Sequence, residues 1–248
     1  MTQLTEKIVT KHLQRLRVSA LIVLSFVALG LGMGQPEARP VSAGALSGLT
    51  VCLDPGHGGY DGGARARDSG RWEKELTLRI ARETQTVLEE QGAKVLLTRS
   101  GDVCLSDEGS GKTRKRADLQ KRVELARDAG ADVFLSIHLN EYRDRGESGP
   151  QVYYQRGADA GRLLAGVLQQ ALVDGLRPAR VRAANPGDYY VLRHAAMPAV
   201  LVECGFLSNP EEEKQLLDTA YHRRIAQAVA AGLSGWMELR ARTGGNGG

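Results

Sequence analysis

Short apolar runs alternate with stretches of helical periodicity from about residue 48 onward, and this alternation constrains the fold more than any other feature. Runs at residues 49–53, 94–98 and 132–137 are typical of buried strands. Between them, residues 73–91 and 116–129 carry apolar side chains on one helical stripe. Strand, helix, strand, helix, strand predicts crossovers between parallel strands. We therefore expect an α/β fold with a single, mostly parallel twisted sheet flanked by helices on both faces.

The second half of the chain continues this pattern. Further strands are expected at residues 151–155, 189–192 and 199–203, and further helices at residues 158–173 and 219–239. Between the last of these strands and the last helix, Asn209 is expected to cap a helix with Pro210 at its first position. Glu212, three residues after the cap, would complete a capping box. Residues 241–248 are rich in glycine, which predicts a flexible tail.

The first 34 residues have the pattern of a signal peptide or a membrane anchor. Residues 18–33 are continuously apolar and follow a positive cluster, a layout that suits a secretory signal. The apolar stretch is slightly short for a spanning helix, but an uncleaved anchor stays open. The positive flank predicts export of the remainder, with residues 35–47 as a linker and residues 48–240 as one folded domain.

Cysteine usage argues against both a disulfide framework and a thiolate metal site. The chain has three cysteines, and none forms a CxxC pair. Cys52 and Cys204 lie in predicted strands, where a free thiol packs as a small hydrophobic group.

Three residues of types that bind zinc stand at the ends of predicted elements. His57 follows the first strand, Glu73 begins the first helix, and His138 closes the third strand. In open α/β sheets, ligands bind outside the carboxyl ends of the strands, so these side chains are expected to meet at one edge. Two imidazoles and one carboxylate leave a fourth position on zinc, which lowers the pKa of a bound water to about 7. The alternative is that the two histidines only satisfy polar groups at the sheet edge.

A fourth residue, Glu203, ends another apolar run and is the candidate general base. Glu141 is a competing base, but it lies in a polar loop that is expected to be solvated. His194 is expected in a surface loop, with a substrate contact as the alternative.

Six segments extend this hypothesis: LDPGHGGYDGGA, WEKELTL, KVLLTR, LQKRVELA, FLSIHLN and YYVLRHAAMPAVLVECGFLSNPEEEKQL. In this order they resemble the successive motifs of the zinc-dependent N-acetylmuramoyl-L-alanine amidases of the amidase 3 family. The resemblance spans residues 50–233. It implies that zinc is held by His57, Glu73 and His138, and that Glu203 takes a proton from water and passes it to the leaving amine. The bond cut would join the lactyl group of N-acetylmuramic acid to L-alanine of peptidoglycan.

The chain departs from larger relatives of that kind by its short connection after His138. Only 14 residues separate His138 from Tyr153, which leaves no room for an inserted inhibitory segment. The chain therefore looks most like the compact spore cortex subgroup, the germination-specific amidases that help to form muramic lactam. This resemblance implies that activation depends on a partner protein or on zinc loading.

Three rival functions are weighed against this expectation. The basic run at residues 112–122 raises nucleic-acid binding, but it lacks interleaved aromatic residues and is expected to be a solvated helix face, so no nucleic-acid partner is expected. A zinc carboxypeptidase or peptidoglycan endopeptidase would place its first ligands closer together than His57 and Glu73. A non-catalytic, membrane-tethered wall-binding protein would not need all four residues. We expect an exported enzyme at the cell wall, secreted or held at the membrane by an uncleaved leader.

Overall fold

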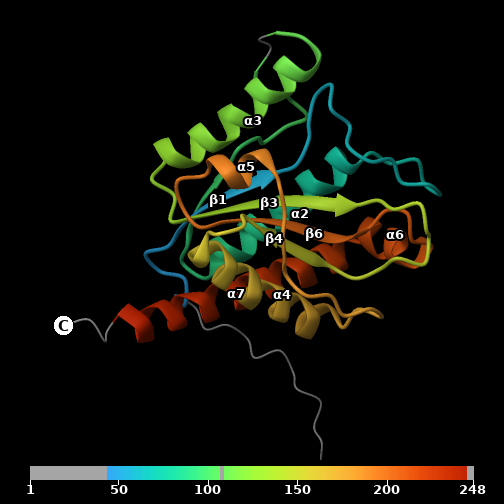
Figure 1. Cartoon of the computed structure of the whole chain (residues 1–248). Coiled ribbons are helices and arrows are strands. Elements are labelled where there is room, and N and C mark those ends of the chain that lie inside the picture. Colours follow the sequence, from blue (N-terminus) through green and yellow to red (C-terminus); the bar gives the residue numbers. More distant parts are fainter. Residues whose placement is uncertain (1–43, 107–108, 245–248) are drawn as a thin grey trace, which may run out of the picture. The chain divides into compact units, whose positions relative to one another are not determined.

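The computed structural model describes residues 44–106 and 109–244, and its elements follow the expected alternation (Figure 1). The strands are β1 (Thr50–Pro55), β2 (Lys94–Leu97), β3 (Val133–Asn140), β4 (Gln151–Tyr154), β5 (Asn185–Pro186) and β6 (Ala199–Phe206). The helices are α2 (Glu73–Glu90), α3 (Gly111–Asp128), α4 (Asp159–Leu176), α5 (Tyr190–His194), α6 (Pro210–Leu217) and α7 (Thr219–Gly244). Among the described helices, none combines the length and apolarity needed to cross a membrane. The expected leader lies outside the described residues.

The six described strands form one sheet in the order β2-β1-β3-β6-β4-β5. Strands β2, β1, β3 and β6 are parallel to one another, whereas β4 runs antiparallel to β6. The reversal has a simple cause: the ten residues between β3 and β4 are too few for a crossover, which needs about a dozen or more. The expectation of a single, mostly parallel sheet is confirmed, but the direction of β4 was not predicted.

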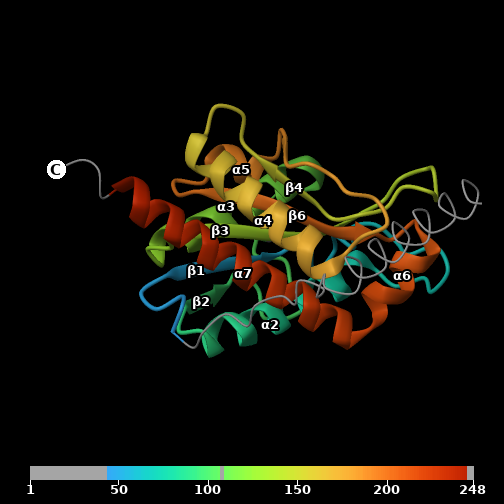
Figure 2. The same cartoon turned by 90° about the horizontal axis from the view of Figure 1, so that it is seen from below.

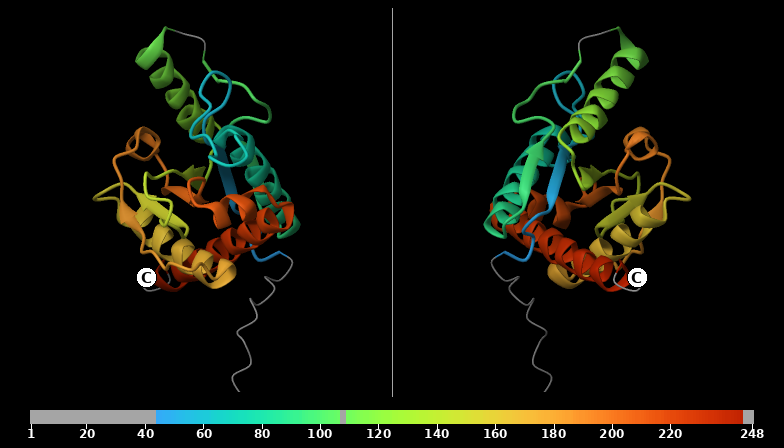
Figure 3. Two further views of the ribbon diagram at one scale, coloured as in Figure 1. Left: turned by 90° about the vertical axis from the view of Figure 1, so that its right-hand side faces the viewer. Right: turned by 90° about the vertical axis from the view of Figure 1, so that its left-hand side faces the viewer.

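Helices cover both faces of the sheet, as expected (Figures 1 and 2). On one face, α2, α4 and α7 enclose the larger apolar core, to which Val51, Leu135 and Val202 contribute from the central strands. On the other face, α3 and α5 cover a smaller core that contains Cys52 and Phe134. Figure 3 shows α3 in green and α7 in red on opposite sides of the sheet. Cys52 and Cys204 are both buried free thiols, which confirms their packing role.

One predicted strand is wrong. Residues 189–192 were expected to form a strand, but the structure has the short helix α5 there, and β5 takes the edge of the sheet instead. Val191 and Leu192 are both buried in the smaller core. Neighbouring side chains that enter the same core fit a helical turn, because successive residues of a strand point to opposite faces.

Several predicted boundaries also differ. Helix α3 begins at Gly111, five residues before its expected start, and α7 continues to Gly244, into the segment predicted as a tail. Leu46, in the predicted linker, is fully buried and donates its backbone N–H to the carbonyl of Gln91 at 3.0 Å. Apolar burial therefore extends beyond the periodic segments at the amino-terminal end, whereas residues 240–242 in the last turns of α7 are exposed.

The cap of α6 is confirmed, but the capping box is not. The Asn209 side chain accepts hydrogen bonds from the backbone N–H groups of Glu211 and Glu212, with Pro210 at the first helical position. The Glu212 carboxylate does not return to the cap. It accepts instead from the backbone N–H of Gly149 at 2.7 Å and from that of Phe206 at 2.8 Å, and so joins the loop before β4 to the end of β6.

Candidate metal centre

The candidate site lies at the carboxyl ends of β1, β3 and β6, which meet at one edge because the strands are parallel. His138 of β3 is the register partner of Glu203 of β6, and the β3–β6 pairing becomes irregular just beyond it. Ile137 and Leu139, on either side of His138, point into the larger core, so His138 points to the opposite face. The irregularity lies next to the site, a frequent place for such bulges, and the pairing resumes at Asn140 and Phe206.

His57 lies in the loop after β1 in an unusual backbone conformation. Its φ of 63° is in the left-handed region, which costs a non-glycine residue about 1–2 kcal/mol. Two buried guanidinium groups hold the loop in place. Arg122 donates to the carbonyl oxygen of His57 at 2.7 Å, and Arg99 donates to that of Pro55 at 2.9 Å. These bonds explain how the strained position is maintained.

Glu73, the first residue of α2, has both carboxylate oxygens fixed. Oε1 accepts from the backbone N–H of Leu139 and lies 3.0 Å from His138 Nδ1. Oε2 accepts from the backbone N–H of Ala64 and lies 3.1 Å from His57 Nε2. Burial alone would raise the pKa of Glu73, but the two histidines outweigh it and hold that pKa well below its usual range. The carboxylate is therefore ionised and oriented.

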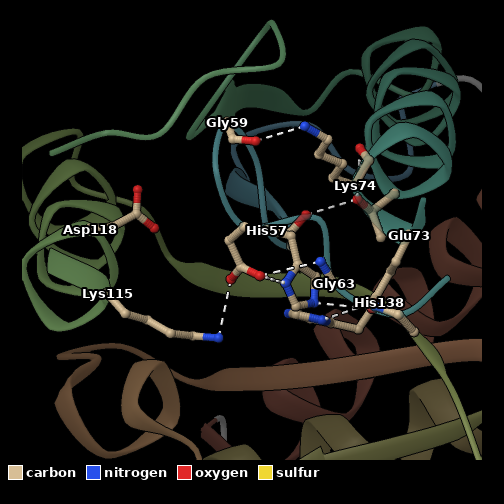
Figure 4. Close-up of polar contacts among 12 residues, drawn as sticks. His57, Gly59, Gly63, Glu73, Lys74, Lys115, Asp118 and His138 are labelled. Carbon is tan, nitrogen blue, oxygen red and sulfur yellow. Dashed lines mark hydrogen bonds and ion pairs between the residues drawn. The ribbon is translucent and has the colours of Figure 1, made fainter. Parts of the chain in front are cut away.

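These three side chains form a donor cluster that fits a metal ion (Figure 4). One donor atom from each of His57, Glu73 and His138 lies within 4.8 Å of the others. Two imidazoles and a carboxylate are the donor set of catalytic zinc sites that keep an open position. The sequence predicted that these residues lie at the carboxyl edge of the sheet, and the structure shows them in one cluster.

A further carboxylate, that of Asp61, lies beside the second ring nitrogen of His57. Asp61 Oδ1 lies 3.0 Å from His57 Nδ1, and Asp61 Oδ2 lies 3.1 Å from the Lys115 ammonium. Lys115 reaches toward the site from α3 (Figure 4). Burial would lower the pKa of His57, but the hydrogen bonds and charges of Asp61 and Glu73 raise it to about 9. A carboxylate on the second ring nitrogen fixes the orientation and the tautomer of a metal-binding histidine. Sequence reasoning missed Asp61, whose only signal was its position four residues after His57.

Glu203 is the carboxylate without a fixed partner. It is 9% exposed, and its Oε2 has no hydrogen-bond partner among the described residues. Burial, followed by the charge of Glu73, raises the pKa of Glu203 well above its usual range. The rings of Tyr153 and Tyr189 lie 5.4 Å apart, and burial, followed by the negative charge of Glu203, raises the pKa of both phenols.

All four residues line one pocket of about 350 Å³. Its walls come from the loop after β1, from α3, and from Tyr189 and Tyr190 at the start of α5. A pocket of this volume holds a small organic group beside the donor cluster.

A buried ionic network forms part of the pocket lining. Arg122 is 1% exposed and contacts Asp54 at 2.9 Å and Asp118 at 2.8 Å. Asp54 also accepts hydrogen bonds from Thr98 and Ser136. The expectation that residues 112–122 form a solvated face is therefore wrong for Arg122, because its charge has buried carboxylate partners.

Glu141, the competing base, and His194, the alternative substrate contact, lie away from the donor cluster. Glu141 lines the rim of the pocket, is exposed, and lies 3.5 Å from Arg67. His194 is exposed at the end of α5, not in a loop, and its ring stacks on that of Tyr190 at 4.2 Å. The described geometry gives neither residue a contact with the donor cluster.

The family model for N-acetylmuramoyl-L-alanine amidases matches residues 51–235, a span that contains every residue of the donor cluster and Glu203. The chain belongs to this family. The germination-specific N-acetylmuramoyl-L-alanine amidase of Bacillus subtilis is 36% identical over 190 residues, which cover 76% of this chain and 79% of that protein.

Solved structures agree with this membership. The CwlD amidase of Clostridioides difficile, solved in complex with the GerS lipoprotein, is 33% identical with a TM-score of 0.72, and the match covers 77% of this chain and 99% of that chain. The catalytic domain of CwlV, an amidase of Paenibacillus polymyxa, is 32% identical with a TM-score of 0.67, covering 77% and 98%. The similarity to CwlD and to the germination-specific amidase confirms the resemblance to the compact subgroup.

Proposed function

We propose that this protein hydrolyses the amide bond between N-acetylmuramic acid and L-alanine of the peptidoglycan stem peptide. Family membership supports the reaction class. One observation carries the mechanism: Glu203, a buried carboxylate with one oxygen that has no hydrogen-bond partner among the described residues, lines the same pocket as the cluster of His57, Glu73 and His138.

The three clustered residues would hold a zinc ion. When bound in such a site, zinc polarises a carbonyl group and lowers the pKa of water toward neutrality. Other groups of the chain orient the side chains that would bind the metal. The backbone N–H groups of Leu139 and Ala64 orient Glu73, and Asp61 orients His57, so the donors are pre-arranged.

Glu203 would act as the general acid and base. Its raised pKa brings it closer to the operating pH, where a carboxylate can accept a proton from the attacking water and then release it. The acceptor of that proton is the amine nitrogen of L-alanine, which leaves as a neutral amine. Glu141 is not suited to this role because its carboxylate is exposed and lies near Arg67.

We further propose an exported enzyme that acts at the cell wall in spore cortex maturation, at the step toward muramic lactam. The similarity to the germination-specific amidase supports this role. The complex of CwlD with the GerS lipoprotein supports an activating protein partner here. Residues 1–34 would serve as the signal or membrane anchor and the residues between that segment and Leu46 as a linker. The catalytic domain would extend from Leu46 to the end of α7 at Gly244.

The test is the identity of the amine that appears when the purified protein acts on peptidoglycan. The proposal predicts new L-alanine amino termini and intact glycan strands, loss of the activity with a chelator, and recovery with zinc. New D-amino acid termini would instead indicate an endopeptidase or carboxypeptidase. Binding to peptidoglycan with no new terminus at any zinc concentration would indicate the non-catalytic alternative.

A further inference from the structure

A second hollow adjoins the candidate metal centre. It has a volume of about 390 Å³ and lies between α3 and α5. We call it the basic groove, because five of its seven lining residues are basic: it is lined by Lys112, Lys115, Arg116, Leu119, Tyr190, Arg193 and His194. Lys115, Leu119 and Tyr190 also line the metal-site pocket, so the two hollows are adjacent.

The two hollows differ sharply in charge. Six carboxylate side chains line the metal-site pocket, from Asp54, Asp61, Glu73, Asp118, Glu141 and Glu203. Within the described residues, no carboxylate side chain lines the basic groove. A ligand with one neutral and one anionic half would therefore bind with its anionic half in the groove.

The stability of α3 does not account for these cations. Lys112, Lys115 and Arg116 lie in the first turns of α3, where the positive end of the helix dipole disfavours them, and the first turn has no acidic residue. Lys112 and Arg116 are exposed and form no ion pair with a described residue. Arg116 lies 5.9 Å from the ring centroid of Tyr190 and so faces the groove. An anion in the groove would offset this unfavourable concentration of charge.

We propose that the basic groove binds the carboxylate groups of the stem peptide and thereby orients the substrate across the metal centre. This inference rests on the proposed function. The carboxyl group of muramic acid is consumed in the scissile amide, so the glycan side carries no charge, whereas the stem peptide beyond L-alanine carries free carboxylates. The glycan side and the peptide side of the scissile bond therefore differ in charge, and the basic groove is complementary to the anionic peptide side.

The test uses the double variant Lys112→Gln/Arg116→Gln, which removes two groove charges outside the metal-site pocket. The substrate is a set of soluble fragments released from peptidoglycan by a muramidase, after removal of phosphate polymers. Loss of two charge-assisted contacts predicts about a tenfold rise in KM with little change in kcat. The matched control, Lys94→Gln/Arg156→Gln, removes two exposed charges that form no ion pair with a described residue and should leave both constants unchanged.

A second substrate isolates the carboxylates. The same fragments, with their peptide carboxyl groups converted to amides, should be cleaved equally well by the wild type and the groove variant. A groove variant equal to the control on native fragments would overturn the inference, as would an equal loss on amidated fragments. An effect confined to fragments that retain phosphate polymers would assign the groove to that polymer and overturn the proposal. If the wild type releases no L-alanine amine, the proposed function itself fails.

Discussion

Glu73 and Glu203 line one pocket but have opposite surroundings. Two backbone N–H groups and two histidines surround Glu73, and its pKa is lowered. Glu203 is buried with one oxygen that has no partner among the described residues, and its pKa is raised. Environments that move two carboxylate pKa values apart give them different roles. Glu73 is thus suited to a metal, and Glu203 to proton transfer.

Gly56 has no room for a side chain beside the ring of His138. A Cβ atom at this position would lie 2.4 Å from His138 Cε1 and 2.5 Å from Nε2. We expect Gly56→Ala to displace the imidazole and to weaken zinc binding by about 10–100-fold, as changes around metal ligands do. Competition with a chelator measures the affinity, and circular dichroism checks the fold. Gly166→Ala, at an open position, is the control and should keep full affinity. Wild-type affinity in the Gly56 variant would show that His138 does not bind the metal.

Asp54 provides a pH-dependent contribution to stability. Burial would raise its pKa, but Arg122, Thr98 and Ser136 outweigh burial and lower it. The contribution is therefore present above the unfolded pKa of about 3.9 and is lost as the pH falls through the folded value. Asp54→Asn should cost about 3 kcal/mol near neutral pH, because it breaks a buried ion pair.

Urea unfolding between pH 3 and pH 8 measures this cost. The difference from wild type should be constant from about pH 5 upward and shrink below about pH 4. Asp159→Asn, which removes an exposed ion pair with Arg162, is the control and should change stability little at any pH. A difference that grew as the pH fell would contradict the lowered pKa.

The residues that sequence could predict are those at strand ends. His57, His138 and Glu203 each close an apolar run, so parallel strands bring them together. Asp61 and Arg122 could not be found in this way. Their roles depend on a loop conformation and on a long-range contact between α3 and β1, and neither leaves a periodic signal.

Helices α4 and α7 pack so closely that Gly232 has no room for a side chain. A Cβ atom at Gly232 would lie 2.7 Å from Leu168 Cδ2 and 3.1 Å from Leu168 Cα. Alanine gains about 1 kcal/mol of helix propensity over glycine, but overpacking against backbone costs about 1–3 kcal/mol. We expect Gly232→Ala to lower the free energy of unfolding.

The matched change Gly166→Ala, in α4 with nothing within 4 Å, should raise the free energy of unfolding by up to about 1 kcal/mol. Thermal unfolding of both variants measures the contrast. A stabilised Gly232 variant would show that the two helices do not pack as closely as described.

Elements in which apolar residues recur at a regular spacing were predictable from the sequence, whereas short elements without such a spacing were not. The long helix α2 follows from its apolar stripe and ends one residue before its expected limit. Five-residue α5 has too few positions to show a period, so its apolar residues resembled a strand. The Glu212 carboxylate binds the loop before β4 and the end of β6 instead of its own helix terminus, because the buried N–H groups of Gly149 and Phe206 need an acceptor.

The two faces of the sheet divide stability and chemistry between them. The larger apolar core lies under α2, α4 and α7, whereas Asp54, His138 and Glu203 belong to the pocket that α3 and α5 border. Parallel strands place the carboxyl ends together, and α2 brings Glu73 to the same edge. Topology predicted the location of the site, but the charge contrast between the pocket and the basic groove required the packing of α3 beside α5.

Glu203→Gln tests the separation of metal binding from proton transfer most directly. Zinc content and the rate of L-alanine amine release are measured on the same purified sample. The variant should hold as much zinc as the wild type, because Glu203 lies outside the donor cluster, while turnover falls by about a thousandfold with loss of the general base. Wild-type turnover, or loss of zinc together with turnover, would contradict this division of roles.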